Sequence, residues 1–230
     1  MVKQYTIVDT FSGCGGSSLG WKMAGFKELL AVEMDENAVA TFRANFPEVN
    51  IYAGDINYLT SAMCMQITGL KSGELDVFGG SPPCQGFSHT GKRNISDSRN
   101  QLFTKYARLL HVLKPKVFVM ENVTGMVSGR MKSTYLEIVK CLRECGYRVK
   151  GQIMNAQYFG VPQSRERTII IGVRNDLNIE PSHPKPFTKP ITFAEQQQIK
   201  KLQNDNPNKE PESSKNRHWQ NKYQEIQPQK

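Results

Sequence analysis

Short apolar runs alternate with segments of helical period along most of the chain, and this alternation limits the possible folds more than any other feature. The apolar runs lie at 5–8, 29–32, 51–53, 77–78, 117–120 and 168–173, and the helical segments lie at 17–24, 35–46, 57–70, 99–114 and 133–145. Strands and helices that alternate at this spacing form a sheet of mostly parallel strands, with helices on both faces. The sequence therefore predicts an α/β fold.

A glycine-rich turn and two acidic residues follow the first three predicted strands. The turn is Asp9–Gly16, Glu33 ends the second apolar run, and Asp55 follows the third. In doubly wound sheets such a turn brings backbone N–H groups close to a ligand, and a carboxylate about 20 residues further on binds ribose hydroxyls. These residues predict a site for a nucleoside-containing cofactor. On this pattern alone, both NAD and S-adenosylmethionine fit.

A cysteine in a loop stiffened by two prolines follows the fourth predicted strand. Cys84 lies outside any apolar run, whereas a structural cysteine is usually buried within one. A nucleophilic cysteine needs a nearby cation, and Arg165 and Arg167 are the candidates. The fifth predicted strand ends at Glu121, which places a carboxyl group at the same edge of the sheet. The pattern predicts a nucleophile and a proton donor side by side.

Composition indicates one domain and an acidic partner. The chain has 230 residues, of which 38% are hydrophobic, enough for one buried core. Lys and Arg number 30 against 21 Asp and Glu, a net charge of +9. Nine of the basic residues lie between Lys92 and Lys132, which includes the polar loop at 89–99 directly after the cysteine. This distribution favours a polyanionic substrate.

Several classes of protein are not expected from this sequence. No apolar run approaches the length of about 18 residues that a membrane helix requires, and no secretory signal is recognised, so we expect a cytoplasmic protein. The five cysteines include no Cys-x-x-Cys pair, so we expect neither a disulfide framework nor a metal site. The chain is polar from about residue 195 on. We therefore expect a compact domain at 1–190 and a polar linker at 191–230.

Four segments of the chain form an ordered series: Asp9–Gly16, Gly79–Ser88, Glu121–Val123 and Gln157–Arg167. Their sequences and their order resemble the motifs of DNA (cytosine-5) methyltransferases. The resemblance covers about residues 4–187. It implies a Rossmann-like fold of the S-adenosylmethionine-dependent methyltransferases. It further implies methyl transfer from S-adenosylmethionine to carbon 5 of cytosine in double-stranded DNA, in a bacterial restriction–modification system.

The resemblance also implies a role for individual residues. Cys84 would add to ring carbon 6 of a cytosine flipped out of the duplex, and Glu121 would hold or protonate ring nitrogen 3. Arg167 would contact the cytosine carbonyl, with Arg165 supporting the same charge cluster. The implied cofactor-binding residues are Asp9, Phe11, Ser12, Gly13, Gly15, Gly16, Glu33, Met34, Asp55, Ile56, Pro83 and Leu102. The implied DNA-contacting residues are Gln85, Ser88, Lys92, Arg93, Arg99 and Asn122.

The C-terminal part of the chain departs from the family pattern. Family members normally continue into a target-recognition region and a late segment that returns to the cofactor-binding domain, and neither is recognised here. We therefore expect a truncated chain, or one subunit of a split enzyme whose second chain carries target recognition. Two alternatives stay open. One is the same chemistry on transfer RNA, and the other is a noncatalytic binding subunit, which the intact Cys84, Glu121 and Arg167 disfavour.

Overall fold

A computed structural model of the chain describes residues 4–83, 101–127, 132–186, 189–190, 192–195 and 197. The chain divides into two compact units. The first contains residues up to Met154 together with Glu166–Lys185, and the second contains Asn155–Arg165 and the residues from Pro186 on. The boundary at residue 190 that composition predicts stays a prediction.

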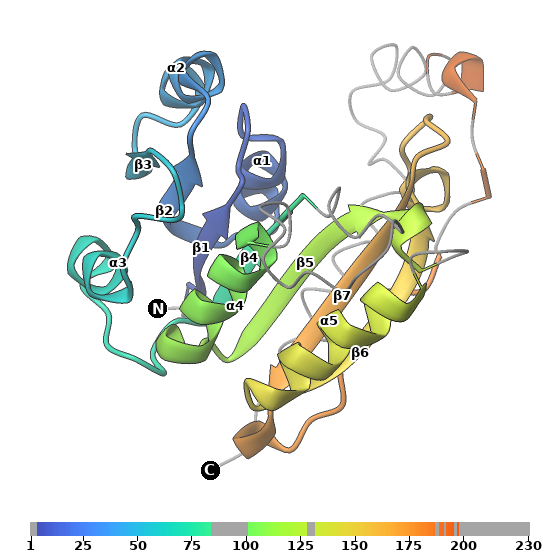
Figure 1. The fold of residues 1–230 in the computed structure, drawn as a ribbon. Helices are drawn as coiled ribbons and strands as arrows, with labels where there is room; N and C mark the ends of the chain where they lie inside the picture. Colours follow the sequence, from blue (N-terminus) through green and yellow to red (C-terminus); the bar gives the residue numbers. More distant parts are fainter. Residues whose placement is uncertain are drawn as a thin grey trace, which may run out of the picture. The chain divides into compact units, whose positions relative to one another are not determined.

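The first unit is built on a mixed, mostly parallel sheet (Figure 1). Its strands are β1 (Thr6–Thr10), β2 (Lys27–Glu33), β3 (Ile51–Ala53), β4 (Val77–Gly80), β5 (Val117–Val123), β6 (Tyr147–Asn155) and β7 (Glu166–Arg174). The spatial order is β3-β2-β1-β4-β5-β7-β6. The pairs from β3 to β5 are parallel, and β7 runs antiparallel to β5. The order reverses between β1 and β4, which is where such sheets bind ligands.

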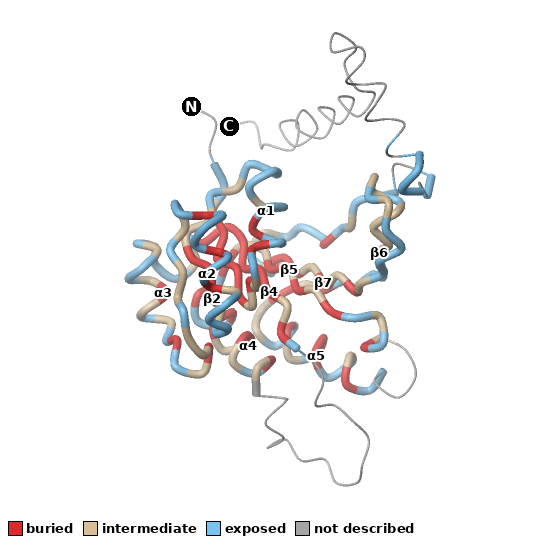
Figure 2. Tube along the Cα trace, turned by 90° about the horizontal axis from the view of Figure 1, so that it is seen from above, coloured by how far each residue is buried: buried red, intermediate tan, exposed pale blue. Residues whose placement is uncertain are grey.

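Helices cover both faces of this sheet. They are α1 (Gly16–Met23), α2 (Glu36–Asn45), α3 (Ser61–Thr68), α4 (Gln101–Leu113) and α5 (Lys132–Glu144), with short 3-10 turns at Thr124–Met126, Ala156–Phe159 and Asn175–Leu177. Neighbouring residues of β2 point to opposite faces, as a strand requires. Leu30 packs in the core shared with α3, α4 and α5, whereas Ala31 packs with Phe42 and Phe46 on the α2 side. Figure 2 shows that the buried residues concentrate between these layers.

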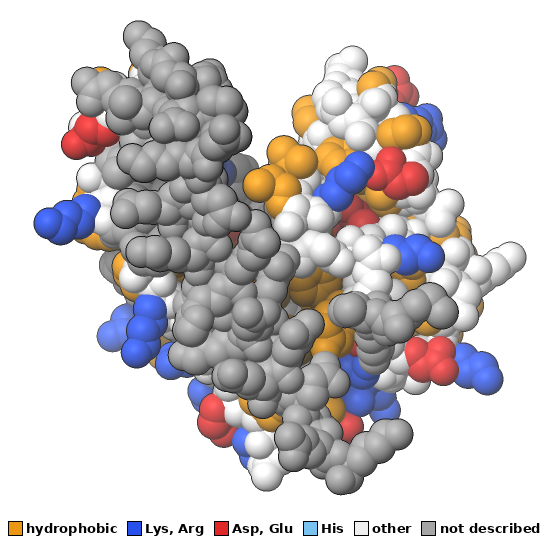
Figure 3. Space-filling model, turned by 180° about the vertical axis from the view of Figure 1, so that it is seen from behind, with side chains coloured by type: hydrophobic (Ala, Val, Ile, Leu, Met, Phe, Trp, Pro, Cys, Tyr) orange, Lys and Arg blue, Asp and Glu red, His pale blue; other side chains and the backbone are white. Residues whose placement is uncertain are grey.

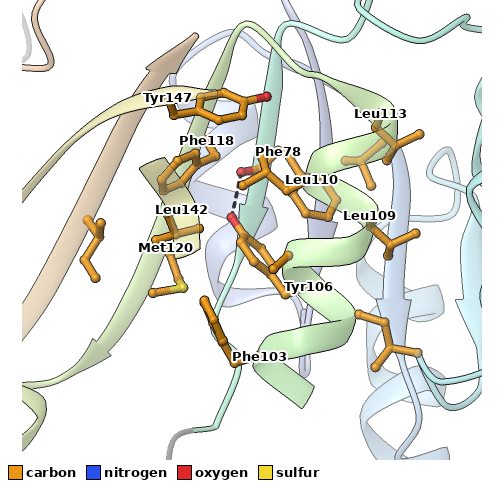
Figure 4. Close-up of a cluster of buried hydrophobic side chains, with 14 of the residues drawn as sticks. Phe78, Phe103, Tyr106, Leu109, Leu110, Leu113, Phe118, Met120, Leu142 and Tyr147 are labelled. Carbon is orange, nitrogen blue, oxygen red and sulfur yellow. Dashed lines mark hydrogen bonds between the residues drawn. The ribbon is translucent and has the colours of Figure 1, made fainter. Parts of the chain in front are cut away.

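The larger core lies between the sheet and helices α4 and α5 (Figure 4). The rings of Phe78 and Tyr106 lie 4.8 Å apart, and the Tyr106 hydroxyl donates to the Phe78 carbonyl at 3.4 Å. The Phe118 and Tyr147 rings meet edge to face at 5.2 Å. The first pair joins β4 to α4, which covers the sheet, and the second joins β5 to β6, which extends it. The strands that carry the candidate site residues are therefore firmly packed on this face.

Two glycines in β4 are required by close packing on either side of the strand. A side chain on Gly79 would collide with the Asp9 carboxylate, and one on Gly80 would collide with Thr10 and Tyr106. Because glycine has no Cβ, β4 can lie against these side chains without displacing them. The Gly-Gly pair before the cysteine loop thus has a structural reason in addition to its place in the motif.

The α/β class with a mostly parallel sheet is confirmed. The six predicted strands correspond to β1, β2, β3, β4, β5 and β7. Strand β6 is missing from the prediction, although Tyr147 and Val149 are buried and alternate with more exposed residues. Local caps explain two helix starts, because the Asp35 side chain accepts from the Ala38 N–H at 2.8 Å and Thr60 accepts from the Met63 N–H at 3.1 Å.

The second unit contains a loop closed by hydrogen bonds and the first turn of a short helix. The Asn155 side chain accepts from the Gln157 N–H at 3.1 Å, and the Ala156 N–H donates to the Arg165 carbonyl at 3.0 Å. Further on, the Thr192 hydroxyl accepts from the Glu195 N–H, and the Glu195 carboxylate accepts from the Thr192 N–H. This reciprocal pair is a capping box. The Thr-x-x-Glu spacing could have predicted it.

Candidate active site

The turn after β1 has an unusual backbone. Phe11, Gly13 and Gly15 all have positive φ values, of 59°, 55° and 95°. A bulky residue such as Phe11 rarely adopts this conformation, and such outliers cluster at binding sites. A Cβ added to Gly13 would meet nothing within 4 Å, so open space adjoins the turn on the Gly13 side.

Ser12 fastens this turn to the end of β2. Its hydroxyl donates to the Asp9 carbonyl at 3.0 Å and accepts from the Val32 N–H at 3.3 Å, and its own N–H donates to the Val32 carbonyl at 3.1 Å. Ser12 is 4% exposed, so its side chain acts on the backbone around the site. A cofactor contact of its side chain stays a prediction.

Glu33 is held in place by three backbone donors. Its carboxylate accepts from the N–H groups of Gly13 at 2.8 Å, Met34 at 2.8 Å and Asp35 at 2.9 Å. The structure thus brings together the two features that the sequence analysis linked, the glycine turn and the acid at the end of β2. A carboxylate fixed beside open space can accept further hydrogen bonds from a ligand's hydroxyl groups.

Asp55 and Ile56 follow β3 at the same edge of the sheet. Both Asp55 oxygens accept hydrogen bonds from Asn57, at 2.8 Å from its backbone N–H and at 2.9 Å from its side-chain amide. The Ile56 side chain is 4% exposed and lies in the large core. The Arg108 guanidinium donates to the carbonyls of Ile56 and Leu59, at 3.4 and 2.6 Å, and so fixes this loop from α4. The sequence analysis missed this role of Arg108.

Asp9 has a different environment from the other acids. It is 2% exposed, and its carboxylate accepts a hydrogen bond from the Ser17 hydroxyl in the first turn of α1. Burial raises its pKa from 3.8 to about 6, partly offset by the Ser17 hydrogen bond. Asp9 therefore supports the turn from beneath α1. Direct contact with a cofactor stays a prediction for this residue.

Asn122 holds the start of the cysteine loop. Its side-chain amide donates to the Pro82 carbonyl at 2.9 Å, and its side-chain oxygen accepts from the Val123 N–H at 2.9 Å. Asn122 is 6% exposed, so these bonds are shielded from water. The bond to Pro82 joins β5 to the segment that leads into Cys84. Asn122 thus acts on the backbone of the loop, and its contact with DNA stays a prediction.

Glu121 and Arg167 form an ion pair at the end of β5. The Arg167 Nε lies 2.9 Å from Glu121 Oε1, and the two side chains are 29% and 33% exposed. One Arg167 Nη also donates to the Glu166 carbonyl at 2.7 Å. Arg165 belongs to the second unit, where its N–H donates to the Gln163 carbonyl at 2.9 Å. A carboxyl group that is one-third exposed, beside a fixed guanidinium, can bind a polar ring edge.

The other predicted site residues are less closely tied to this geometry. Met34 is 64% exposed, Pro83 is exposed, and Leu102 packs partly buried against the large core. Gly16 begins α1. The remaining predicted residues lie outside the described part of the chain; they are Cys84, Gln85, Ser88, Lys92, Arg93 and Arg99.

On one side of the molecule, the described basic residues are not gathered into one patch. Figure 3 shows acidic and basic side chains interspersed over the described surface on that side. In the basic stretch, Lys116 pairs with the buried Asp76 at 2.5 Å, and Arg108 binds backbone carbonyls, so both stabilise the fold. Among the described residues, no helix has the length and apolar character to cross a membrane. The same residues contain no group of three or more side chains arranged to hold a metal ion.

The residues present fit a nucleoside-containing cofactor. The open space at Gly13, the positive φ of Phe11 and the fixed Glu33 carboxylate all lie at one turn. This turn follows β1, at the point where the strand order reverses. The arrangement offers backbone and carboxylate groups to a ligand without rearrangement of the core.

Comparison with known proteins agrees with this geometry. Type II methyltransferase M1.HphI of Haemophilus parahaemolyticus is 41% identical over 184 residues, which are 77% of this chain and 49% of the relative. Type II methyltransferase M.AquIA of Picosynechococcus is 36% identical over 199 residues, 83% of this chain and 79% of the relative. This chain spans about half the length of the first relative but most of the second.

A solved structure shares the fold as well. It is named as a DNA modification methyltransferase encoded within a prophage (E. coli), is 32% identical and superposes with a TM-score of 0.69. The match covers 82% of this chain and 53% of that one. The expectation of a Rossmann-like methyltransferase fold is thereby confirmed. The sequence model of C-5 cytosine-specific DNA methylases matches residues 5–230, and this chain belongs to that family.

Proposed function

We propose that this chain is the cofactor-binding and catalytic part of an enzyme that methylates carbon 5 of cytosine in DNA. The observation that carries the proposal is the Glu121–Arg167 ion pair at 2.9 Å. The next residue, Asn122, donates a hydrogen bond to the Pro82 carbonyl. This arrangement puts an acid and a guanidinium beside the segment that leads into Cys84. The relatives are named Type II methyltransferases, which supports a restriction–modification setting.

The glycine turn and the strand-end acids would hold S-adenosylmethionine. Glu33 would accept hydrogen bonds from the ribose hydroxyls while Gly13 keeps it in position. Phe11 would stack on the adenine ring, and Asp55 would accept from the adenine amino group. S-adenosylmethionine, when bound, supplies an electrophilic methyl group.

The chain's own residues would prepare the cytosine. The Cys84 thiolate would add to carbon 6, which makes carbon 5 nucleophilic. Glu121 would bind ring nitrogen 3 and donate a proton there as negative charge develops. Arg167 would bind the cytosine carbonyl and hold the Glu121 carboxyl group in place. Removal of the carbon-5 proton by a base would then release the Cys84 thiolate and restore the aromatic ring.

Transfer of a radioactive methyl group tests the reaction itself. We expect incorporation from labelled S-adenosylmethionine into duplex DNA of mixed sequence and none with Cys84→Ser. A parallel assay with transfer RNA distinguishes the RNA alternative, since label in RNA but not in DNA would contradict the DNA assignment. An unchanged rate with Cys84→Ser would contradict the covalent mechanism.

Calorimetry with S-adenosylmethionine tests the cofactor site separately. We expect binding by the wild-type chain and a loss of at least tenfold in affinity with Glu33→Ala. Glu36→Ala, which changes an acid in the first turn of α2, is the matched control and should bind as the wild type does. Equal binding by all three proteins would contradict the assigned role of Glu33.

We also propose that a further polypeptide part completes the enzyme on the open face of β5 and β7. Phe118, Met120 and Ile170 are fully buried under α4 and α5, whereas Val119 and Ile171 on the opposite face are only half-buried. Parallel sheets normally have both faces covered.

The comparisons bear on whether that part belongs to a second chain. M.AquIA is little longer than the matched segment, so a family member of similar length exists. Addition of a candidate second chain should raise methyl transfer by the wild-type chain. A charged residue at Val119 should prevent this increase while S-adenosylmethionine binding persists. An increase that Val119→Lys does not affect would contradict this docking face.

A further inference from the structure

Two cysteines lie one helical turn apart at the end of α5. Cys141 lies in the last turn of the helix, and Cys145 directly follows its last residue, Glu144. The Cys145 N–H donates to the Cys141 carbonyl at 3.0 Å, so the helical path continues through both residues. Residues four apart in a helix lie on the same face. The two side chains therefore stand next to each other.

The two thiols are close enough to affect each other's ionisation. Hydrogen bonding with the neighbouring Cys145 thiol lowers the pKa of Cys141 to about 7. The same interaction, together with burial, raises the pKa of Cys145 well above its usual range. Both side chains are half-buried, packed against the rim of the large core. Cys141 is thus the thiol of the pair that ionises more readily, and the Cys145 thiol lies beside it.

The remaining described cysteines lack this arrangement. Cys64 is 1% exposed, and burial raises its pKa to about 11. Cys14 is exposed and has no cysteine four residues away. The combination of an activated thiol, a neighbouring thiol and partial access is therefore specific to the end of α5 among the described residues.

We propose that Cys141 and Cys145 are a reversible oxidation site that forms an intrahelical disulfide when the protein meets a hydroperoxide. The Cys141 thiolate attacks the terminal peroxide oxygen, the O–O bond breaks, and Cys141 becomes a sulfenic acid while the peroxide leaves as an alcohol or as water. The Cys145 thiol then attacks the sulfenic sulfur. The S–S bond forms, the S–O bond breaks, and the hydroxyl group leaves with the Cys145 proton as one water.

The end of α5 can accommodate this bond by a local change. Cβ atoms four residues apart on a helix are about 5–6 Å from each other, whereas a disulfide brings them to about 3.5–4.5 Å. The last turn must therefore tighten. Cys145 is the first residue after α5, and Gly146 follows it with a φ of 96°, so the helical path ends directly after the pair. The movement would remove the weak contact of the Cys145 sulfur with the Ala107 carbonyl at 3.9 Å.

The sequence around the pair gives a sharp test. Trypsin cuts after Lys140, Arg143 and Arg148, so the two cysteines fall on the separate peptides 141–143 and 144–148. The folded chain is treated with hydrogen peroxide at neutral pH, its remaining thiols are alkylated, and the digest is examined by mass spectrometry. We expect the two peptides joined by a disulfide, with separation on reduction. The yield should rise as the pH increases from 6 to 8.

Two controls make the outcome decisive. With Cys145→Ser, the joined pair should disappear, and Cys141 should instead react with dimedone as a sulfenic acid. The same treatment of the urea-unfolded chain should give at least fivefold less of the joined pair at short times. The proposal is overturned if unfolding does not slow the reaction. It is also overturned if either cysteine pairs mainly with Cys14 or Cys84, or if both stay reduced while the exposed Cys14 oxidises.

Discussion

The Arg167 guanidinium on β7 reaches diagonally to the Glu121 carboxylate on the neighbouring strand β5, with Nε 2.9 Å from Oε1. In the antiparallel pairing of β5 and β7, Arg167 lies opposite Val123, and Glu121 lies opposite Ile169. The two charged residues are thus diagonal neighbours on one face of the sheet, a distance that long side chains can span. Because β7 is antiparallel to β5, its first residues, including Arg167, lie at the edge of the sheet where β5 and the other parallel strands end.

Removal of the Glu121 charge should affect catalysis far more than stability. Glu121→Gln keeps the size of the side chain but loses the carboxyl group that would serve nitrogen 3. We expect single-turnover methyl transfer to fall by about 10²–10⁴-fold, the usual contribution of a general acid. The free energy of unfolding should change by less than about 1 kcal/mol, because a pair that is one-third exposed contributes little.

The matched control for this change is Glu48→Gln, which breaks the exposed Lys22–Glu48 pair far from β5. It should leave methyl transfer unchanged. Transfer by Glu121→Gln within threefold of the wild-type rate would contradict the assigned role of Glu121.

Loss of the Asn122 side chain should loosen the cysteine loop. Asn122→Ala leaves the buried Pro82 carbonyl and the Val123 N–H without this partner. We expect the free energy of unfolding to fall by about 0.5–1.5 kcal/mol for each of these two hydrogen bonds that is lost. Methyl transfer should also fall, while calorimetry should show unchanged S-adenosylmethionine affinity.

Asn122→Asp separates the two bonds of this side chain. It keeps an acceptor for the Val123 N–H but has no donor for the Pro82 carbonyl. Its methyl transfer should therefore resemble that of Asn122→Ala. Wild-type transfer by the aspartate variant would show that the bond to Pro82 is not what positions the loop.

The sequence pattern predicts the sheet and the positions of the strand-end acids because strands alternate with helices at a regular spacing. Strand β6 was missed because Gly151 and Gln152 interrupt its apolar alternation, and pairing with β7 stabilises it. The antiparallel direction of β7 cannot be read from its own residues, since a half-buried strand has the same period in either direction. It follows from the short connection between β6 and β7.

In the candidate site too, the features that depend on local sequence were predicted, and those that depend on tertiary contacts were not. The acid at Glu33 and the glycine turn were predicted, since their spacing reflects a repeated local geometry. The hydrogen bond from Asn122 to the Pro82 carbonyl was not predicted. The two residues are 40 positions apart in the sequence and come together only because β4 and β5 are neighbours in the sheet. The burial of Asp9 was likewise not predicted, since it depends on Ser17 and α1 lying above the strand.

A methyl group at Gly13 should block cofactor binding at a modest cost in stability. Gly13 has a φ of 55°, and a Cβ there meets nothing within 4 Å, so the cost is backbone strain of about 1–2 kcal/mol. Gly69→Ala is the matched control, because Gly69 has a φ of 70° and equally open surroundings at the end of α3. We expect similar unfolding free energies for the two variants in urea.

Binding should separate the two glycine variants. Calorimetry should show at least tenfold weaker S-adenosylmethionine binding for Gly13→Ala and wild-type binding for Gly69→Ala. If the two variants bind equally well, the open space at Gly13 is not part of the cofactor site.

The stability of the fold should decrease as the pH rises through the neutral range. Burial, with the nearby Asp9 charge, raises the pKa of Glu28 from 4.5 to about 8, and burial raises that of Asp9 to about 6. Between the unfolded and folded pKa values the folded state binds more protons, so the free energy of unfolding falls with increasing pH. The Glu28 contribution is complete below about pH 4.5 and is lost by about pH 8.

Glu28→Gln isolates this contribution, because the glutamine resembles the protonated acid and can still accept from the Ser18 hydroxyl, which lies 3.0 Å from Glu28 Oε1. Urea unfolding at pH 5, pH 6.5 and pH 8.5 should show a clear loss of stability for the wild type and a much smaller loss for the variant. Asp9 titrates over a lower range, so its share of the loss should remain in Glu28→Gln and end near pH 6. Equal losses in the two proteins above pH 6 would mean that Glu28 is already ionised in the folded state.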